Sequence, residues 1–426
     1  MTAAPFPVPT LARQIFAAAR DVGCEARIVG GAVRDWLLAT GTVATGGDVT
    51  TKGPADIDMA IACPIADAAA ALRRRKLKII DTGVAHGTIT VLGDGALIEL
   101  TQTRVDLETD GRHAVIGFTD DWAEDARRRD FTVNALYVTE DGRLEDPIGG
   151  LLDLIAGRLR FVGDARTRIA EDGLRMLRYC RLLPRFGEGG VDPEALEAIS
   201  AMATRVERLS GERIARELRH LFAAPRPQLG VQLLYDTSLD HGILGLRLQP
   251  DALALLPPDD AVISALASTA DLKWLVRLAA CLDSNVIRDS GSGRDVADRL
   301  AKRLRLSRAE RRYLLSLCVG AAQISTGDNL AGHGWQRVAW FLHQAGGDPA
   351  AIYIASMARN GQAVSARRMG ELASWCPPEC PVTAADLLSH GVDKGPRLGD
   401  MLSAIERDWV MQDFTPTREQ LLATLH

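Results

Sequence analysis

The first 145 residues of the chain alternate short apolar runs with polar or glycine-rich breaks. "AVRDWLLA" at 32–39 has a helical pattern, the glycines and threonines of 40–54 predict a loop, and the polar stretch 104–113 predicts a mobile segment. Five runs are short enough for strands or other buried segments: 25–29, 56–62, 87–93, 96–103 and 132–138. The first 145 residues therefore predict a small mixed sheet with helices.

After Pro147 the apolar period becomes helical. Apolar residues at 174, 177, 182 and 183 suit one helix within 171–186, and most later segments keep a helical spacing between proline and glycine breaks. The pattern therefore predicts an α+β head followed by an all-α remainder.

Composition narrows the class of protein. The chain has 426 residues, 47% hydrophobic and 25% charged, as in ordinary soluble proteins. It shows no apolar run of membrane-spanning length and no signal peptide at its start, so a cytoplasmic location is expected. Seven cysteines, an odd number, predict reduced thiols. "CPPEC" at 376–380 has neither a second pair nor histidine partners, which disfavours a zinc site.

The net charge of −5 argues against a general polyanion binder, although the local charge is uneven. Arginines crowd the stretches 154–187 and 302–312. Such runs are usually solvated helix faces, but they can also follow a phosphate backbone. The sequence leaves both interpretations open.

Two aspartates interrupt the apolar run 56–62. Asp56 and Asp58 are one residue apart, so in a strand they share one face, where they repel each other and lose hydration. Mg²⁺ would compensate them, since it binds one or two carboxylates together with substrate phosphates. Glu99, on a neighbouring strand, is the candidate third acid and a possible base. The alternative is that the pair caps a turn after Pro54.

A glycine pair lies upstream, in "IVGGAVRDWL" at 28–37. Gly30 and Gly31 would let the backbone approach a phosphate, and the first amides of the following helix would point at it. A Gly-Gly turn alone is a weak signal. Together with Asp56 and Asp58, however, the glycine pair predicts a triphosphate site next to a metal site.

A third motif is "DARRRDFTVNALYV" at 125–138. Arg128 and Arg129 beside Asp130 are costly unless they meet phosphates, a sugar or carboxylates. Asn134 can donate to a ribose hydroxyl or to a triphosphate oxygen. The alternative is a salt-bridged turn that leads into a strand.

Taken in order, these motifs resemble the class II nucleotidyltransferases, which include CCA-adding tRNA nucleotidyltransferases and bacterial poly(A) polymerases. The resemblance rests on "GGAVRD", "DID", "RRDFTVNAL", "EDPIGGLLDL" and "EDGLRMLRYCR". "SGERIARELRHLF" resembles the family's neck-bracing helix, and 386–402 resembles the tail of CCA-adding enzymes, with Lys394 in place of the usual proline. The family's layout implies a catalytic head, a base-reading neck, a body and a tRNA-binding tail at 1–145, 146–225, 226–365 and 366–426.

The resemblance also implies roles for single residues. Asp56 and Asp58 would bind catalytic Mg²⁺. A larger set would bind the nucleotide. Its first members along the chain would contact the triphosphate, the next the sugar and phosphates, and the last would include the base-reading residues: Gly30, Gly31, Arg34, Asp125, Arg128, Asn134, Asp172, Arg175 and Arg178.

Base selection is assigned to Asp172 and Arg175, at i and i+3, which would emerge on one helix face. The carboxylate would accept from the amine of cytosine or adenine, whereas uracil and guanine present an acceptor there. The alternative is a surface ion pair.

The implied reaction is attack by an RNA 3′-hydroxyl on the α-phosphorus of CTP or ATP. "IIDTGVAHGTITV" at 79–91 lacks the basic segment of poly(A) polymerases, and 104–113 resembles the element with which CCA-adding enzymes switch from C to A. CCA addition to tRNA is therefore expected ahead of poly(A) synthesis. A catalytically silent RNA-binding relative is the third possibility, which the intact aspartate pair disfavours.

Candidate tRNA contacts lie in the basic run 302–312, at Arg303, Arg305 and Arg308. No "HD" pair occurs among the histidines, so no phosphohydrolase activity is predicted. Neither a membrane nor an obligatory protein partner is expected.

Overall fold

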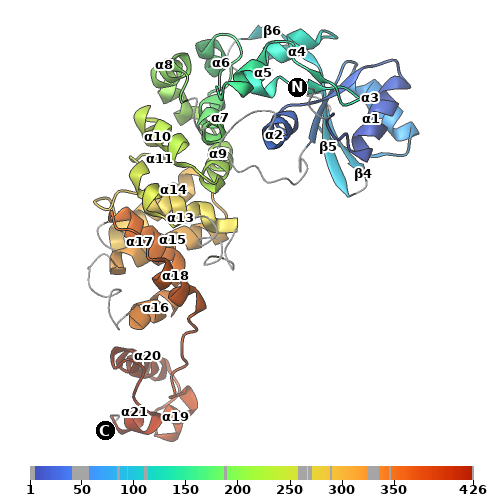
Figure 1. Cartoon of the computed structure of the whole chain (residues 1–426). Coiled ribbons are helices and arrows are strands. Elements are labelled where there is room, and N and C mark those ends of the chain that lie inside the picture. Colours follow the sequence, from blue (N-terminus) through green and yellow to red (C-terminus); the bar gives the residue numbers. More distant parts are fainter. Residues whose placement is uncertain are drawn as a thin grey trace. The chain divides into compact units, whose positions relative to one another are not determined.

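The computed structural model divides the chain into two compact units. One comprises 1–209 with 236–242, and the other 210–235 with 243–426. The structure describes residues 5–40, 57–83, 87–93, 95–109, 114–186, 190–257, 266, 271–287, 290–324, 335–344 and 347–424. Every described strand lies in the first unit, and the second is built of helices and their connections (Figure 1). The predicted α+β head with an all-α remainder is confirmed, whereas the finer division into neck, body and tail stays a prediction.

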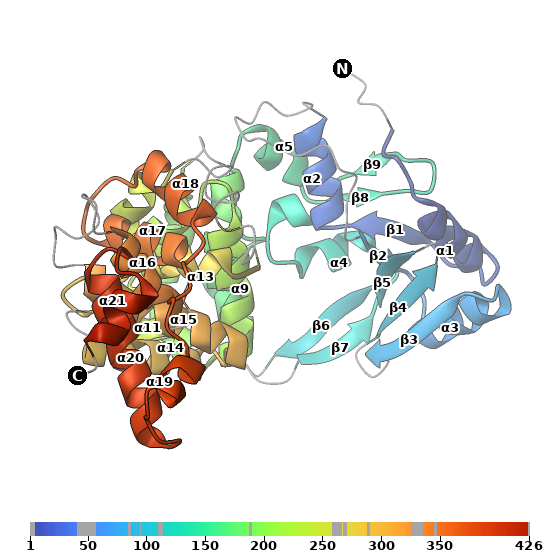
Figure 2. The same cartoon turned by 90° about the horizontal axis from the view of Figure 1, so that it is seen from below.

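Within the described residues, one mixed sheet of seven strands forms the centre of the head (Figure 2). Strands β2 and β5 are parallel, and all other neighbouring pairs are antiparallel. The strand order across the sheet is β3 (Lys78–Gly83), β4 (Thr88–Gly93), β5 (Ala96–Gln102), β2 (Ile57–Ile61), β1 (Ala26–Val29), β8 (Tyr137–Val138) and β9 (Leu144–Glu145).

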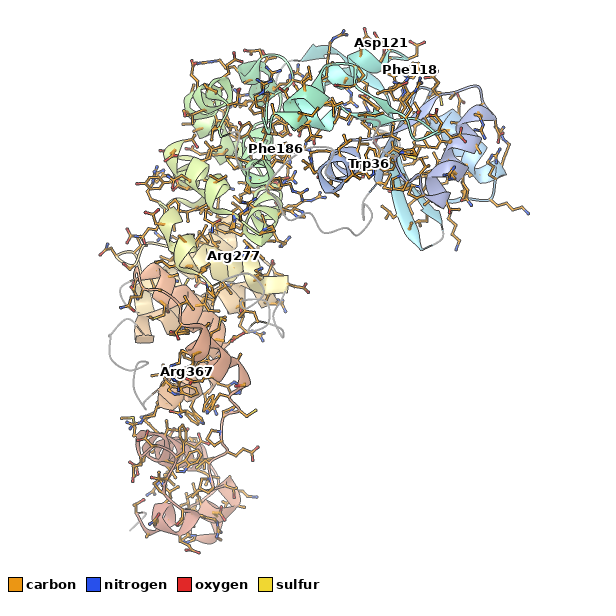
Figure 3. All side chains as sticks on the ribbon, viewed as in Figure 1. Trp36, Phe118, Asp121, Phe186, Arg277 and Arg367 are labelled. Atoms are coloured by element: carbon orange, nitrogen blue, oxygen red, sulfur yellow. The ribbon has the colours of Figure 1, made fainter. Side chains whose placement is uncertain are left out.

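The two faces of this sheet are covered differently. Helices α1 (Thr10–Arg20) and α3 (Ile65–Arg74) pack on the face where Met59 and Leu100 are buried. On the other face, α4 (Trp122–Arg127) covers Ala60. Asp121 caps α4 by accepting from the Ala123 amide at 2.7 Å (Figure 3). Because strand side chains alternate, the polar positions of β2 and β5 project from this second face, in a part that no described helix covers.

One prediction about the head needs correction. The stretch 104–113 is predicted to be mobile, but its described part forms strand β6 (Arg104–Thr109), which pairs antiparallel with β7 (Ala114–Phe118). Residues 110–113 lie outside the described residues. Backbone hydrogen bonds hold this hairpin whatever the polarity of its side chains. The run 132–138, predicted as a strand or another buried segment, is fully buried and consists of a 3₁₀ turn, η2 (Thr132–Asn134), followed by β8. The predicted loop at 40–54 lies outside the described residues beyond Thr40.

The helices after the sheet also differ from the single helix expected over 171–186. Helix α6 (Ala165–Glu171) ends before Asp172, which is extended with φ −148° and ψ 105°. A new helix, α7 (Leu174–Leu182), then runs into a 3₁₀ turn, η3 (Leu183–Arg185). The remaining elements of this region are α5 (Gly150–Ile155), α8 (Pro193–Met202) and η4 (Ala203–Arg208).

The rest of the chain is helical in its described part. Buried Arg277 donates to the carbonyls of Phe222 and Ala224, each at 2.6 Å, and so closes the end of α9 (Figure 3). The elements are α9 (Gly211–Ala223), α10 (Gln228–Asp236), α11 (Leu239–Leu244), η5 (Pro250–Leu255), α13 (Lys273–Ala280), α14 (Ser290–Arg303), α15 (Arg308–Ile324), α16 (Trp335–Gln344), α17 (Pro349–Arg359), α18 (Ala366–Ser374), α19 (Ala384–Ser389), α20 (Pro396–Met411) and α21 (Arg418–Ala423).

No described helix combines the length and the apolar character needed to cross a bilayer. All seven cysteines are unpaired. The cytoplasmic location stays a prediction.

Gly150 sets the approach of α5 to η2. A Cβ there would lie 2.0 Å from the carbonyl oxygen of Thr132. We expect Gly150→Ala to cost about 3 kcal/mol, the upper range for overpacking, because the obstacle is backbone. The free energy of unfolding in urea measures this. Gly370→Ala is the control: nothing lies within 4 Å of its Cβ position in α18, so a small gain is expected. Equal changes in the two variants would contradict the packing argument.

Candidate active site

Two acidic side chains meet on the uncovered part of the sheet. Asp58 of β2 and Glu99 of β5 are direct partners in the parallel ladder, and both are exposed. Glu99 thus lies on the strand next to Asp58, as predicted, and its role as a third acid stays a prediction. Asp56 lies outside the described residues. Exposed carboxylate oxygens are the donors that hard divalent cations take, so the residues fit such an ion.

The described residues gather no group of three or more histidine, cysteine, aspartate or glutamate side chains suited to a metal. A metal at this sheet would therefore use Asp58 and Glu99 together with Asp56 or with oxygens of the substrate. The partial use of protein ligands is typical of Mg²⁺ in phosphoryl-transfer sites.

The glycine turn adjoins these carboxylates. Val29 is the ladder partner of Asp58, and Gly30 follows it with φ 83° and ψ −137°, a conformation that favours glycine. Helix α2 (Gly31–Ala39) begins at the next residue, as predicted, and Trp36 on it packs against Phe6 with ring centroids 5.2 Å apart (Figure 3). The positive end of α2 therefore lies beside the acidic pair, where a bound triphosphate would be favoured.

A buried polar network connects α2 with η2 and α7. Arg34 is buried, pairs with Asp35 at 2.7 Å and donates to Oδ1 of Asn134. Asn134 donates to Asp130 at 3.0 Å, and the other Asp130 oxygen pairs with Arg178 at 2.9 Å. Three predicted nucleotide-binding residues are thus joined through one carboxylate. Burial lowers the pKa of Arg34, and Asp35 offsets part of that effect.

Asp125 is the centre of a second cluster. Its side chain is 0% exposed and accepts from Arg128 and Arg129, each at 2.8 Å, and from the Tyr137 hydroxyl at 2.9 Å. Burial alone would raise the pKa of Asp125, but Arg129, Arg128 and the hydroxyl outweigh it and hold the pKa below its ordinary value. The salt-bridged turn weighed for this motif is present. This ion pair joins Asp125 to Arg128, and the nucleotide-binding roles of both residues stay predictions.

The geometry predicted for Asp172 and Arg175 is wrong, because the helix is broken between α6 and α7. The Asp172 carboxylate accepts from the amide of Leu174, the first residue of α7, at 3.0 Å, and Gly173 is the N-cap of that helix. Arg175 instead pairs with Glu171 and donates to the carbonyls of Arg168 at 2.8 Å and Arg128 at 3.3 Å. Glu171 was not among the predicted site residues, although its i, i+4 spacing from Arg175 is a signal for such a pair.

The three candidate tRNA contacts lie in the second unit. Arg303 ends α14, and Arg308 begins α15. Between them Arg305 is 70% exposed, with Glu212 4.0 Å away. Arg311 of the same run is paired with Asp298 at 3.0 Å. The exposed members form part of the surface, and their contact with RNA stays a prediction.

The comparisons with known proteins cover both units. Residues 26–160 match the family model described as "Poly A polymerase head domain", and 190–246 match "Probable RNA and SrmB- binding site of polymerase A". CCA tRNA nucleotidyltransferase 1, mitochondrial, of Danio rerio is 30% identical over 404 residues, which cover 94% of this chain and 87% of the relative.

A CCA-adding enzyme of Lactobacillus johnsonii is 34% identical over 250 residues, 58% of each chain. Among solved structures, the Bacillus stearothermophilus CCA-adding enzyme in complex with CTP has a TM-score of 0.69 at 24% identity, covering 96% of this chain and 94% of the other. This structural likeness concerns the fold.

Proposed function

The chain belongs to the family of CCA tRNA nucleotidyltransferases, and from that premise we propose that it builds or repairs the CCA end of tRNA. CMP and AMP are added from CTP and ATP without a nucleic-acid template. The RNA 3′-hydroxyl attacks the α-phosphorus, a new phosphodiester bond forms, and pyrophosphate leaves. The observation that carries the proposal is the zebrafish relative, since its match runs through 94% of the chain and not only through the head.

The family uses a divalent cation, and we propose that the cation here is Mg²⁺, held by Asp56 and Asp58 with Glu99. When bound, it lowers the pKa of the attacking hydroxyl and neutralises charge on the leaving oxygens. The side chains and backbone of the protein position the triphosphate. Gly30 and the start of α2 seat the triphosphate, and Arg34, fixed by Asn134, adds a cation beside it. Exposed oxygen donors in direct register support this assignment.

Base selection is proposed for the junction of α6 and α7. The guanidinium of Arg175 donates to the ring acceptors of the base, and Asp172 accepts from the exocyclic amine. Cytosine and adenine offer that amine, whereas uracil and guanine present an acceptor. Glu171 contributes by orienting Arg175 through their ion pair. A site whose polar groups would be left unpaired rejects the wrong base strongly.

The role of Glu171 gives a specificity prediction. Glu171→Gln removes the charge that holds Arg175, so the guanidinium should sample other positions. We expect the preference for CTP over UTP, measured as the ratio of kcat/KM values, to fall about 10-fold or more, the worth of a charged hydrogen bond. Glu197→Gln, which breaks the surface pair with Arg166, should leave the ratio unchanged. An unchanged ratio for Glu171→Gln would remove the orienting role.

The proposed function is tested with the purified chain, a tRNA transcript lacking CCA, Mg²⁺ and each labelled triphosphate in turn. Two C additions followed by one A support the proposal. Long A tails would identify a poly(A) polymerase instead, and no incorporation in any buffer would identify a silent RNA-binding relative. Replacing Mg²⁺ by EDTA, by Mn²⁺ and by Ca²⁺ tests the identity of the cation separately.

A further inference from the structure

Among the described residues, the face of the sheet that carries Asp58 and Glu99 continues across β4 and β3 with exposed side chains. Thr90 is the ladder partner of Glu99, and Ile80 is the partner of Thr90. Partners in a sheet project to the same side, so these residues continue the row of the two carboxylates toward the edge strand. Ile80, at 44% exposure, is accessible from that side.

A second row runs beside the first on the same face. Leu97 lies two residues before Glu99 in β5, Leu92 is its partner in β4, and Lys78 is the partner of Leu92. Leu97 is 51% exposed, and Lys78 is exposed as well. The acidic pair is therefore continued by a surface with large aliphatic side chains and a cation, defined here as the platform: Lys78, Ile80 and Leu97.

The strand order indicates what this platform faces. Gly30 and the start of α2 directly follow β1, which lies on one side of β2 and Asp58. Strands β5, β4 and β3 lie on the other side of β2. In an in-line displacement the attacking and leaving oxygens stand on opposite sides of the phosphorus. If the glycine turn seats the pyrophosphate, the attacking hydroxyl arrives from the side of β5.

We propose that the platform holds the 3′-terminal nucleosides of the RNA acceptor strand. The inference rests on the proposed function and adds the location of the second substrate. Unpaired RNA ends expose base faces that bury well against apolar side chains, and Leu97 lies closest to the acidic pair. Lys78 complements the phosphodiester that joins the last two nucleosides.

The test measures Leu97→Ser and Ile80→Ser in the full chain, with tRNA ending in CC and with ATP. Each substitution replaces an aliphatic side chain, about half exposed in the free protein, by serine and so removes its apolar contact with the RNA. The KM for tRNA should rise about 3- to 10-fold, and the KM for ATP should stay within about 2-fold. Leu152→Ser is the matched control, because Leu152 is an aliphatic residue 68% exposed on α5 and belongs to neither of the two rows.

A second measurement locates the RNA directly. With p-benzoylphenylalanine at position 97, irradiation should cross-link tRNA labelled at its 3′ end, and the same group at position 152 should not. A wild-type enzyme that adds A to tRNA, combined with an unchanged KM for tRNA in Leu97→Ser and no cross-link, overturns the platform alone. A rise in the KM for ATP assigns the face to the incoming nucleotide and also overturns it. A wild-type enzyme without activity would instead contradict the proposed function.

Discussion

Replacing Asp58 with asparagine is expected to reduce nucleotide addition about 10³-fold while leaving the fold intact. Asparagine keeps the size of the side chain but removes the negative charge that a divalent cation needs. Removing a single group that stabilises charge in the transition state can lower the rate of the chemical step by about this factor. Because Asp58 is exposed, the free energy of unfolding should change little. Single-turnover addition of C to tRNA lacking CCA measures the effect.

Asp67→Asn is the matched control for this prediction. Asp67 is also an exposed carboxylate of the head, but it lies in the first turn of α3, which packs on the opposite face of the sheet. That variant should retain wild-type activity. Binding of tRNA to Asp58→Asn, measured by filter retention, should stay within about 2-fold, since affinity depends mostly on phosphate contacts elsewhere. An Asp58→Asn enzyme with more than a tenth of wild-type activity would contradict the assignment of Asp58 as a ligand of the divalent cation.

The parts of the site that the sequence predicted depend on short-range signals. The glycine pair that ends β1 and begins α2 is visible because glycine marks the left-handed turn. Period-two alternation in the run 56–62 predicts one strand face for its two aspartates, and Asp58 is exposed beside Glu99 of the neighbouring strand. Both inferences needed only a few consecutive residues. The structure confirms the glycine turn and the position of Glu99 on the strand next to Asp58, and Asp56 lies outside the described residues.

The parts that were missed depend on residues far apart in the chain. Arg34 and Asn134 are 100 residues apart, and nothing local indicates that they meet or that Asp130 bridges Asn134 to Arg178. Strand β6 is polar, so its pairing with β7 is set by backbone partners and not by a hydrophobic pattern. These arrangements follow from tertiary contacts, which override local propensity.

The break before α7 is a different kind of error. Apolar spacing continues through 171–186, so the periodicity hid a change of direction at Asp172. A cap signal was present, because aspartate is a favoured residue at the start of a helix and Gly173 follows it. Capping residues within a run can therefore indicate a junction of two helices where hydrophobic spacing alone predicts one.

The second large effect is expected at Asp125, whose carboxylate is fully buried beneath two arginines. Asp125→Asn should lower the free energy of unfolding by about 3–5 kcal/mol, because it leaves the guanidinium groups of Arg128 and Arg129 without their buried counter-charge. Urea denaturation followed by tryptophan fluorescence measures this, since Trp122 packs on Tyr137 in the same cluster. Asp121→Asn is the control on the same helix, as asparagine caps a helix about as well as aspartate.

The pH dependence of that difference separates a charge effect from a packing effect. The folded pKa of Asp125 lies below its ordinary value, so its charge stabilises the folded protein fully above the unfolded pKa of about 4. This contribution is lost as the pH falls through the folded pKa, because the carboxyl is then protonated in both states. The gap between wild type and Asp125→Asn should therefore be constant from neutral pH down to about pH 4 and narrow below it. A gap that stays unchanged in acid would show that asparagine acts through shape and not through the missing charge.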